Sequence, residues 1–217
     1  MFKAAIQATA RGLWRLSTLG CATGPHVTRY FMYQAIKAYE KEIQLGDRIL
    51  SISHSNHLCA LVGGSLDKIT EANYPEYSFC KLDLPSNTYT AIVSDQVLEH
   101  ISCHPQQAID EAYRVLVPGG IALHTTCFMV PYHGSPDYTN VNNGDYWRFT
   151  PSGLALLHQK YSRVIAAGGW GTPLMSVIGA LGLNRMPVPE ASWHPLHKLA
   201  MHNRKSYAFM VWVIAQK

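Results

Sequence analysis

The fold is decided by residues 89–120, which read YTAIVSDQVLEHISCHPQQAIDEAYRVLVPGG. A short β-compatible run at Thr90–Ser94 opens this stretch. A helix with one apolar face is predicted over His104–Leu116, where Pro118-Gly119-Gly120 ends it. A second strand is predicted at Ile121–Cys127. The helix is therefore expected to cross over between two parallel strands, which indicates an α/β fold.

The same alternation of strands and helices extends in both directions from this stretch. The other expected strands are Arg48–Ser53, Lys68–Ala72, Tyr77–Leu82, Ser162–Ala167 and Tyr207–Ala215, with a helix from Thr150 to about Tyr161 and a long insertion before the last strand. We therefore predict a doubly wound α/β fold with a seven-stranded, mostly parallel sheet, which is a Rossmann-like arrangement. Two helices, over 1–18 and Val27–Gln44, come first. This divides the chain into an N-terminal helical segment, 1–45, and an α/β domain, 46–217.

Composition excludes several classes of protein. The chain has 217 residues, of which 47% are hydrophobic and 15% charged, so it has enough apolar surface to fold. The low charge indicates that some surface faces an interface, a membrane or an enclosed pocket. A net charge of +4 without any Lys/Arg-rich run does not favour nucleic-acid binding. Five widely spaced cysteines without a C-x-x-C motif predict reduced thiols and a cytoplasmic protein.

Residues 89–120 resemble the fourth strand, the following helix and the turn of class I S-adenosylmethionine-dependent methyltransferases. The matching pieces, in order, are Ala91-Ile92-Val93, Leu98-Glu99-His100, Pro105, Glu111, Arg114-Val115-Leu116 and Pro118-Gly119-Gly120. Residues 131–154 are similar to a segment of a bacterial group associated with glycan or secondary-metabolite pathways. The resemblance covers about residues 46–170. It implies S-adenosylmethionine as cofactor and a methyl transfer, for which we expect an oxygen of a small molecule or glycan as acceptor.

The resemblance also implies a set of cofactor-binding residues. Asp83, after the third expected strand, corresponds to the family's acidic residue that accepts a hydrogen bond from the adenine amino group. Glu71, near the end of the second, corresponds to the carboxylate that binds the ribose hydroxyls. The alternative is that Asp83 caps a turn and Glu71 is a solvated strand end. The full predicted set is Ser51, Ser53, His54, Ser55, Glu71, Asp83, Leu84, Ser94, Asp95 and Gln96.

The loop after the first strand of the sheet departs from the family pattern. The family has an acidic residue followed by G-x-G-x-G, whereas here Ser51 stands for the acid and Ser53, Ser55 and His57 stand for the glycines. Glycine normally lets the backbone approach the ligand closely. Three hypotheses follow: the side chains bind the cofactor, binding is weak and recovered in a complex, or the protein is a catalytically silent subunit that binds a protein partner.

Three residues are candidates for catalysis. His133, after the fifth strand, is the first candidate for a general base that deprotonates an acceptor hydroxyl, and Asp145 is expected to orient it or bind substrate. The alternative for His133 is a loop histidine bonded to backbone. His100, in the Leu98-Glu99-His100 segment, completes the set, while Glu99 is given a structural role. We expect no metal, because one carboxylate supplies too few oxygen ligands for a hard cation.

The N-terminal helices have two interpretations. They are either a lid over the cofactor or an interfacial anchor, in which Phe2 and Trp14, flanked by Lys3, Arg11 and Arg15, lie in a lipid headgroup layer. Contact with a second copy of the chain is a further expectation for this segment. The sequence contains no apolar run of about 18 residues, the length that a membrane-spanning helix needs.

Overall fold

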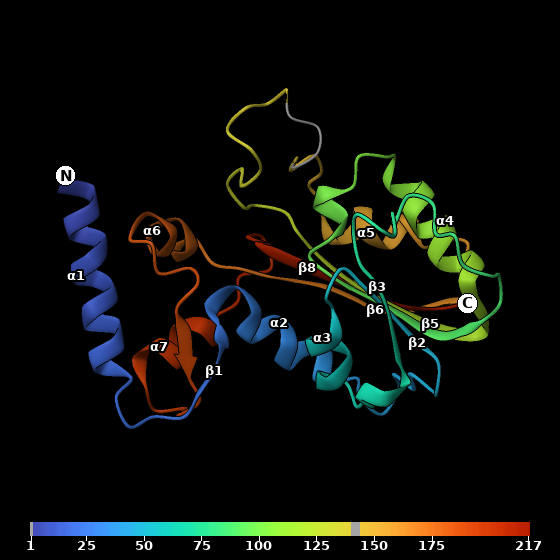
Figure 1. The fold of residues 1–217 in the computed structure, drawn as a ribbon. Helices are drawn as coiled ribbons and strands as arrows, with labels where there is room; N and C mark the ends of the chain where they lie inside the picture. The colour runs from blue at the N-terminus through green and yellow to red at the C-terminus, as the bar shows by residue number, and fades with distance from the viewer. Residues whose placement is uncertain (1, 140–143) are drawn as a thin grey trace.

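The computed structural model describes residues 2–139 and 144–217, and its centre is a six-stranded sheet in the order β3-β2-β4-β5-β8-β6 (Figure 1). The strands are β2 (Ile49–Ile52), β3 (Ile69–Ala72), β4 (Tyr89–Asp95), β5 (Leu116–Cys127), β6 (Arg163–Trp170) and β8 (Met210–Gln216). The first four are parallel to one another, and β8 runs antiparallel to both β5 and β6. The doubly wound, mostly parallel sheet is therefore confirmed.

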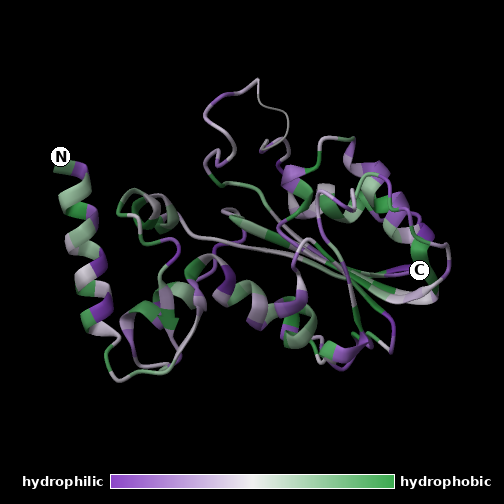
Figure 2. Cartoon of the chain, in the orientation of Figure 1, coloured by the Kyte–Doolittle hydropathy of each residue, from purple (hydrophilic) through white to green (hydrophobic). Residues whose placement is uncertain are grey.

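Helices cover both faces of the sheet because side chains alternate along each strand. Ile49 and Val93 face one core with α2 (Val27–Lys37) and α3 (Asn56–Leu61). Leu50 and Ile92 face the other core with α4 (Pro105–Val115) and α5 (Pro151–Leu157). Short 3₁₀ helices lie at Leu66–Lys68 and Leu98–His100. Strands buried on both faces are mostly apolar, and Figure 2 shows green stretches in the central sheet, although β5 also buries His124 and Thr125.

The starts of α4 and α5 follow from their sequences. Both helices have a proline in the first helical position, where no backbone hydrogen bond is lost. His104 accepts a hydrogen bond from the backbone N–H of Gln106, and Thr150 Oγ1 accepts one from Gly153 N at 2.9 Å. The predicted cap at Thr150 is confirmed. Helix α2 ends at Lys37, whereas the sequence predicted a helix that continues to Gln44.

The expected third strand is wrong, and it explains why the sheet has six strands instead of seven. Residues 77–82 contain only an isolated bridge between Ser78 and Lys81. Side chains of α4 bind the backbone here: Leu82 N donates to Glu111 Oε2 at 2.8 Å, and Gln107 Nε2 donates to Cys80 O at 2.8 Å. Because these groups satisfy the backbone, no strand ladder forms at this edge.

A disulfide joins this segment to the start of α4. Cys80 and Cys103 are bonded, with their Cα atoms 5.8 Å apart, whereas Cys21, Cys59 and Cys127 are free. The expectation that all five thiols are reduced is wrong for this pair. The two cysteines are 23 residues apart in sequence, and only the fold brings them together at one edge of the sheet.

The long insertion before β8 forms a small unit with the N-terminal residues. It contains α6 (Leu174–Ala180), β7 (Pro187–Pro189) and α7 (Pro195–Met201), and β7 pairs antiparallel with β1 (Thr23–His26). The first helix, α1 (Phe2–Ser17), lies beside α6 and α7 at the end of the molecule farthest from α4 (Figure 1). We call α1, β1, α6, β7 and α7 the terminal unit. No helix in the described part of the chain is both long enough and apolar enough to cross a membrane.

Candidate functional site

Two cavities lie where β2, β4 and β5 end, at the edge of the sheet where open α/β folds bind ligands. The larger has a volume of about 1180 Å³, and residues from α2, β4, β5 and α6 line it. The smaller has a volume of about 240 Å³ and lies beside the segment after β3. Gln96 and His100 line both cavities. The two cavities are therefore neighbours, with these two residues between them.

The loop after β2 follows a backbone path that normally requires glycine. Ser53 and His54 have φ angles of 49° and 64°, and Gln96, after β4, has a φ of 58°. Left-handed backbone costs a residue other than glycine about 1–2 kcal/mol. Three such residues next to the cavities are typical of a functional site. The sequence departs from the glycine pattern, but the backbone conformation at this place is the one that glycine favours.

Ser51 and Ser55 have structural roles in this region. Ser51 is fully buried within β2. Ser55 Oγ donates to Ile52 O at 2.5 Å and accepts from Asp95 N at 2.8 Å, so it ties the end of β2 to the end of β4. Of the serines predicted to bind the cofactor, Ser53 lines the smaller cavity.

Glu71 lies beside this loop, at the end of β3. Its carboxylate accepts hydrogen bonds from Asn73 Nδ2 at 2.7 Å and from Asn56 Nδ2. These two bonds lower the pKa of Glu71, so the side chain is ionised. His54 Nδ1 lies 3.7 Å from Glu71 Oε2, and the His54 N–H donates to Asn73 Oδ1 at 2.9 Å. An anion is therefore fixed beside the loop that carries Ser53, outside the lining of the two cavities.

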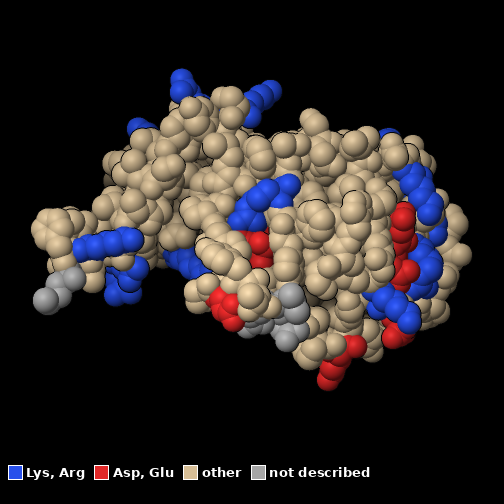
Figure 3. Space-filling model, turned by 90° about the horizontal axis from the view of Figure 1, so that it is seen from above, with Lys and Arg blue, Asp and Glu red and all other residues tan. Residues whose placement is uncertain are grey.

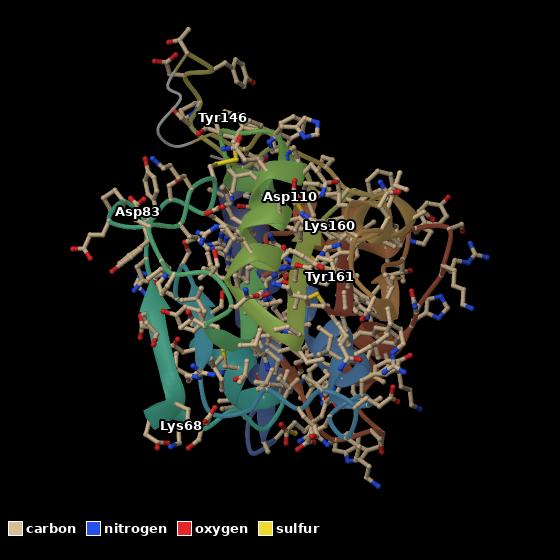
Figure 4. The ribbon with its side chains drawn as sticks, turned by 90° about the vertical axis from the view of Figure 1, so that its right-hand side faces the viewer. Lys68, Asp83, Asp110, Tyr146, Lys160 and Tyr161 are labelled. Atoms are coloured by element: carbon tan, nitrogen blue, oxygen red, sulfur yellow. A yellow bond between two sulfur atoms is a disulfide. The ribbon has the colours of Figure 1, made fainter. Side chains whose placement is uncertain are left out.

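Three other predicted residues also lie away from the described lining of the two cavities. Asp83 is exposed on an outer loop, apart from Tyr146 in the view of Figure 4. The Leu84 carbonyl accepts from Arg114 Nη1 at 2.8 Å, and Ser94 Oγ lies 2.8 Å from His124 Nδ1 in the core.

The smaller cavity is lined by aromatic residues that were not among the predicted cofactor-binding residues. They are Tyr77 and Phe79, from the segment that was expected to form a strand, and Tyr74, which precedes it. Three aromatic residues within six positions, 74–79, are the sequence feature that could have indicated this cavity.

Asp95, at the end of β4, connects the sheet to α2. Its carboxylate accepts hydrogen bonds from Tyr33 OH at 2.5 Å, from Arg29 Nε at 3.3 Å and from Thr125 Oγ1. Burial, together with the Asp95 charge, raises the pKa of Tyr33, which keeps this phenol protonated as a donor. Arg29 also lines the larger cavity, so α2 belongs to the site. Sequence reasoning missed both Arg29 and Tyr33.

The predicted catalytic residues lie together: His133 and His100 line the larger cavity, and Asp145 contacts His133 from within the protein. Asp145 Oδ2 accepts from the His133 N–H at 2.9 Å and lies 3.1 Å from His133 Nδ1. The His100 ring meets the His133 ring edge-on, with centroids 5.0 Å apart, and His100 Nδ1 donates to Gly144 O at 2.7 Å. His133 Nδ1 also lies 3.1 Å from Pro131 O, so both of its partners favour a proton on that nitrogen. Nε2 then carries the free lone pair.

Arg148 keeps Asp145 ionised. Its Nη1 and Nη2 atoms each lie 2.5 Å from a carboxylate oxygen of Asp145, whose side chain is fully buried. Burial opposes ionisation, but the bonds from Arg148 and the His133 N–H outweigh it and hold the pKa of Asp145 below its ordinary value. A buried charge paired in this bidentate way is a fixed anchor for the imidazole.

Glu99 is the functional candidate that was taken as structural. Its side chain lines the larger cavity, is only 1% exposed and accepts from Thr126 Oγ1 at 2.8 Å. Burial raises its pKa. Ligand atoms of Glu99, Cys127 and His133 lie within 4.8 Å of one another, as do those of His100, His133 and Asp145, so the expectation of no metal stays a prediction.

The site can be compared with known proteins. Residues 19–124 match the family model described as a methyltransferase domain. The [4+2]-cyclase SpnF has a similar fold, with a TM-score of 0.50 at 14% identity, over 100% of this chain and 94% of that one. No protein of curated function matches the chain.

Two further solved structures are S-adenosylmethionine-dependent methyltransferases. The one from Thermotoga maritima is 13% identical over 88% of this chain and 91% of its own, with a TM-score of 0.48. The one from Mesorhizobium loti is 12% identical over 83% and 96%, with a TM-score of 0.49.

Proposed function

We propose that the chain is a class I S-adenosylmethionine-dependent methyltransferase that methylates an oxygen atom of a small molecule or glycan held in the larger cavity; the methyltransferase-domain model that matches residues 19–124 supports the activity. The observation that carries the proposal is the group of Glu99, His100 and His133 in the lining of that cavity, with the buried Asp145 in contact with His133. A hydroxyl is a weak nucleophile, so a base within hydrogen-bond reach accelerates its methylation. Such a base has no evident use in a silent subunit.

The residues around the smaller cavity fit the adenosine part of the cofactor. Tyr74, Tyr77 and Phe79 line it, and aromatic side chains suit the flat face of a purine. The left-handed backbone at Ser53 and His54 brings the chain close without glycine. When bound, S-adenosylmethionine supplies an electrophilic methyl group on a sulfonium. Gln96 and His100, which line both cavities, stand where such a ligand passes toward the acceptor.

The residues of the larger cavity divide the remaining work. His133 accepts the proton of the acceptor hydroxyl at Nε2, while Asp145 holds the ring in the tautomer with its proton on Nδ1. Burial raises the pKa of Glu99, which favours its protonated form, and a protonated carboxyl at this wall can donate a hydrogen bond to the acceptor. Arg29, at the α2 side of the cavity, attracts an anionic group.

The proposal places the reaction in the cytoplasm, as the cysteine pattern predicted. The Cys80–Cys103 disulfide weighs against this location, because cytoplasmic thiols are normally kept reduced. The test is to alkylate free thiols in intact cells and then to determine the state of Cys80 and Cys103 by mass spectrometry. A reduced pair supports a cytoplasmic location, and an oxidised pair contradicts it.

The experiment that tests the function has two readouts. Calorimetry measures binding of S-adenosylhomocysteine, and transfer of a labelled methyl group is followed with a panel of hydroxyl-bearing small molecules and glycans. We expect binding in the parent and in His133→Ala, with transfer lost only in the variant. His202→Ala, at the end of α7, is the matched control and should behave like the parent. A parent that binds no S-adenosylhomocysteine is a silent subunit, and transfer only to nitrogen acceptors contradicts O-methylation.

A further inference from the structure

The outer face of α1 carries a row of exposed apolar side chains. Phe2, Leu13 and Leu16 are 82%, 63% and 64% exposed, and Ile6 is exposed as well. At 100° per residue these four fall within an arc of about 80°. Scattered exposed apolar residues need no explanation, but a contiguous row on one helix marks an interaction surface.

Contacts on the other side of α1 hold the helix so that this row faces outward. Trp14, about a third of a turn from the row, is buried and its Nε1 donates to Pro187 O at 2.8 Å. Gln7 Nε2 donates to Ala180 O at 3.0 Å, and Arg11 Nε donates to Gly182 O at 3.2 Å. Since this side holds α1 against α6 and β7, the row cannot turn inward. None of the described α1 residues lines either cavity, so α1 is not the lid of the site.

The charge around the row has a single sign. Helix α1 contains Lys3, Arg11 and Arg15 and no acidic residue, and the first acidic residue of the chain is Glu40. Of the 14 Asp and Glu residues, all but Glu190 lie within residues 40–145. Figure 3 accordingly shows Lys and Arg, but no Asp or Glu, at the end of the molecule where α1 lies.

We propose that the terminal unit docks on an anionic lipid bilayer through the apolar row of α1, with Lys3 beside the row and the long side chain of Arg15 reaching the phosphate headgroups from farther round the helix. A helix with an apolar row and a polar side that is only basic is the kind that lies in a membrane interface. Anionic lipid attracts such basic residues, whereas a protein partner would need an acidic surface of matching shape. The same unit reaches the site, because Met175 and Ala180 of α6 line the larger cavity.

The test measures sedimentation of residues 1–217 with vesicles of phosphatidylcholine alone or with about a third phosphatidylserine. We expect binding to the anionic vesicles only, weakening as salt rises. The double variant Leu13→Ser/Leu16→Ser removes apolar contact, and Lys3→Glu/Arg15→Glu reverses the charge without touching the hydrogen bond of Arg11. Each should weaken binding by at least about tenfold. Leu156→Ser, on the exposed side of α5, is the matched control and should bind like the parent.

Three results would overturn the proposal. The first is equal binding of neutral and anionic vesicles, and the second is parent-like binding of both double variants. The third is self-association of the parent without vesicles, seen by sedimentation velocity and abolished by Leu13→Ser/Leu16→Ser, which would assign the row to a second copy of the chain. Circular dichroism of each variant confirms that it is folded. The proposal is independent of methyl transfer, so loss of vesicle binding leaves the proposed function unaffected.

Discussion

The smaller and larger cavities meet at Gln96 and His100, yet different kinds of residue line them. Aromatic rings and left-handed backbone at Ser53 form much of the smaller one. Apolar residues line the larger one together with ionisable groups, among them the buried Glu99, which accepts from Thr126, and His133, which contacts the buried Asp145. Carboxylates and arginines are therefore part of the larger cavity, whereas the described lining of the smaller one contains none.

This difference predicts how each cavity responds to substitution. A substitution that removes an apolar or backbone contact costs little free energy, because a neighbouring side chain can shift to fill the space. A buried charge that loses its partner keeps the full cost of its desolvation. Changes at the larger cavity should therefore have large effects on catalysis and folding, and changes at the loop after β2 should have small ones.

The largest effect is expected for His133→Ala on turnover. Loss of a general base should lower the rate of methyl transfer by about 10²–10⁴-fold. Affinity for S-adenosylhomocysteine should stay near that of the parent, because His133 lines the larger cavity and not the smaller one. Turnover is measured from pH 5 to 9. Parent-like rates across this range would remove His133 from the mechanism and leave the larger cavity without a candidate base.

The next effect is on stability. Arg148→Ala leaves the buried Asp145 carboxylate without its bidentate partner, which should cost about 3–5 kcal/mol of the free energy of unfolding. Urea denaturation at pH 7 measures it. Arg148→Lys is the matched control and should lose less, because it keeps the charge. A loss below about 1 kcal/mol in the alanine variant would show that water, and not Arg148, stabilises the carboxylate.

The pH dependence of stability should have opposite signs for the two buried carboxyls. Burial raises the pKa of Glu99, so its contribution to stability is complete below the unfolded pKa of about 4.3 and is lost as pH rises through the raised value. Glu99→Gln should therefore gain stability relative to the parent as pH rises from 4 to 8, by at most about 1.4 kcal/mol per pH unit.

Asp145→Asn provides the contrast. The pKa of Asp145 is lowered, so its contribution is present above the unfolded value of about 3.9 and is lost as pH falls through the lowered pKa. The penalty of Asp145→Asn should be largest near pH 7 and shrink toward pH 3. Thermal or urea unfolding across this range compares both variants with the parent. Two parallel profiles would contradict the assignment of opposite shifts.

The smallest effect is expected in the loop after β2. His54→Gly relieves a left-handed residue but adds unfolded-state entropy, so the free energy of unfolding should change by less than about 1 kcal/mol. Ser55→Gly, at the next position, removes two hydrogen bonds and should cost about 1–3 kcal/mol. Equal effects of the two changes would mean that the left-handed conformation at His54 carries no strain.

Much of the fold followed from local patterns in the sequence. The apolar period of residues 104–116, the Pro118-Gly119-Gly120 turn and the cap at Thr150 each depend on neighbours a few residues away. The predicted strand at 77–82 failed for the converse reason. Its β-compatible residues are held by Glu111 and Gln107 of a helix that follows about thirty residues later, and no local pattern encodes that contact.

The candidate catalytic residues show the same division. The sequence by itself placed His133 and His100 after the ends of strands, because the carboxyl ends of parallel strands share one edge of the sheet. Only the tertiary structure decided that Asp145 binds both His133 and Arg148, and that Glu99 is buried at the same wall. It also decided that Asp83 stays outside the cavities. A sequence fixes which residue types follow each strand, whereas burial and hydrogen bonding depend on how distant segments pack.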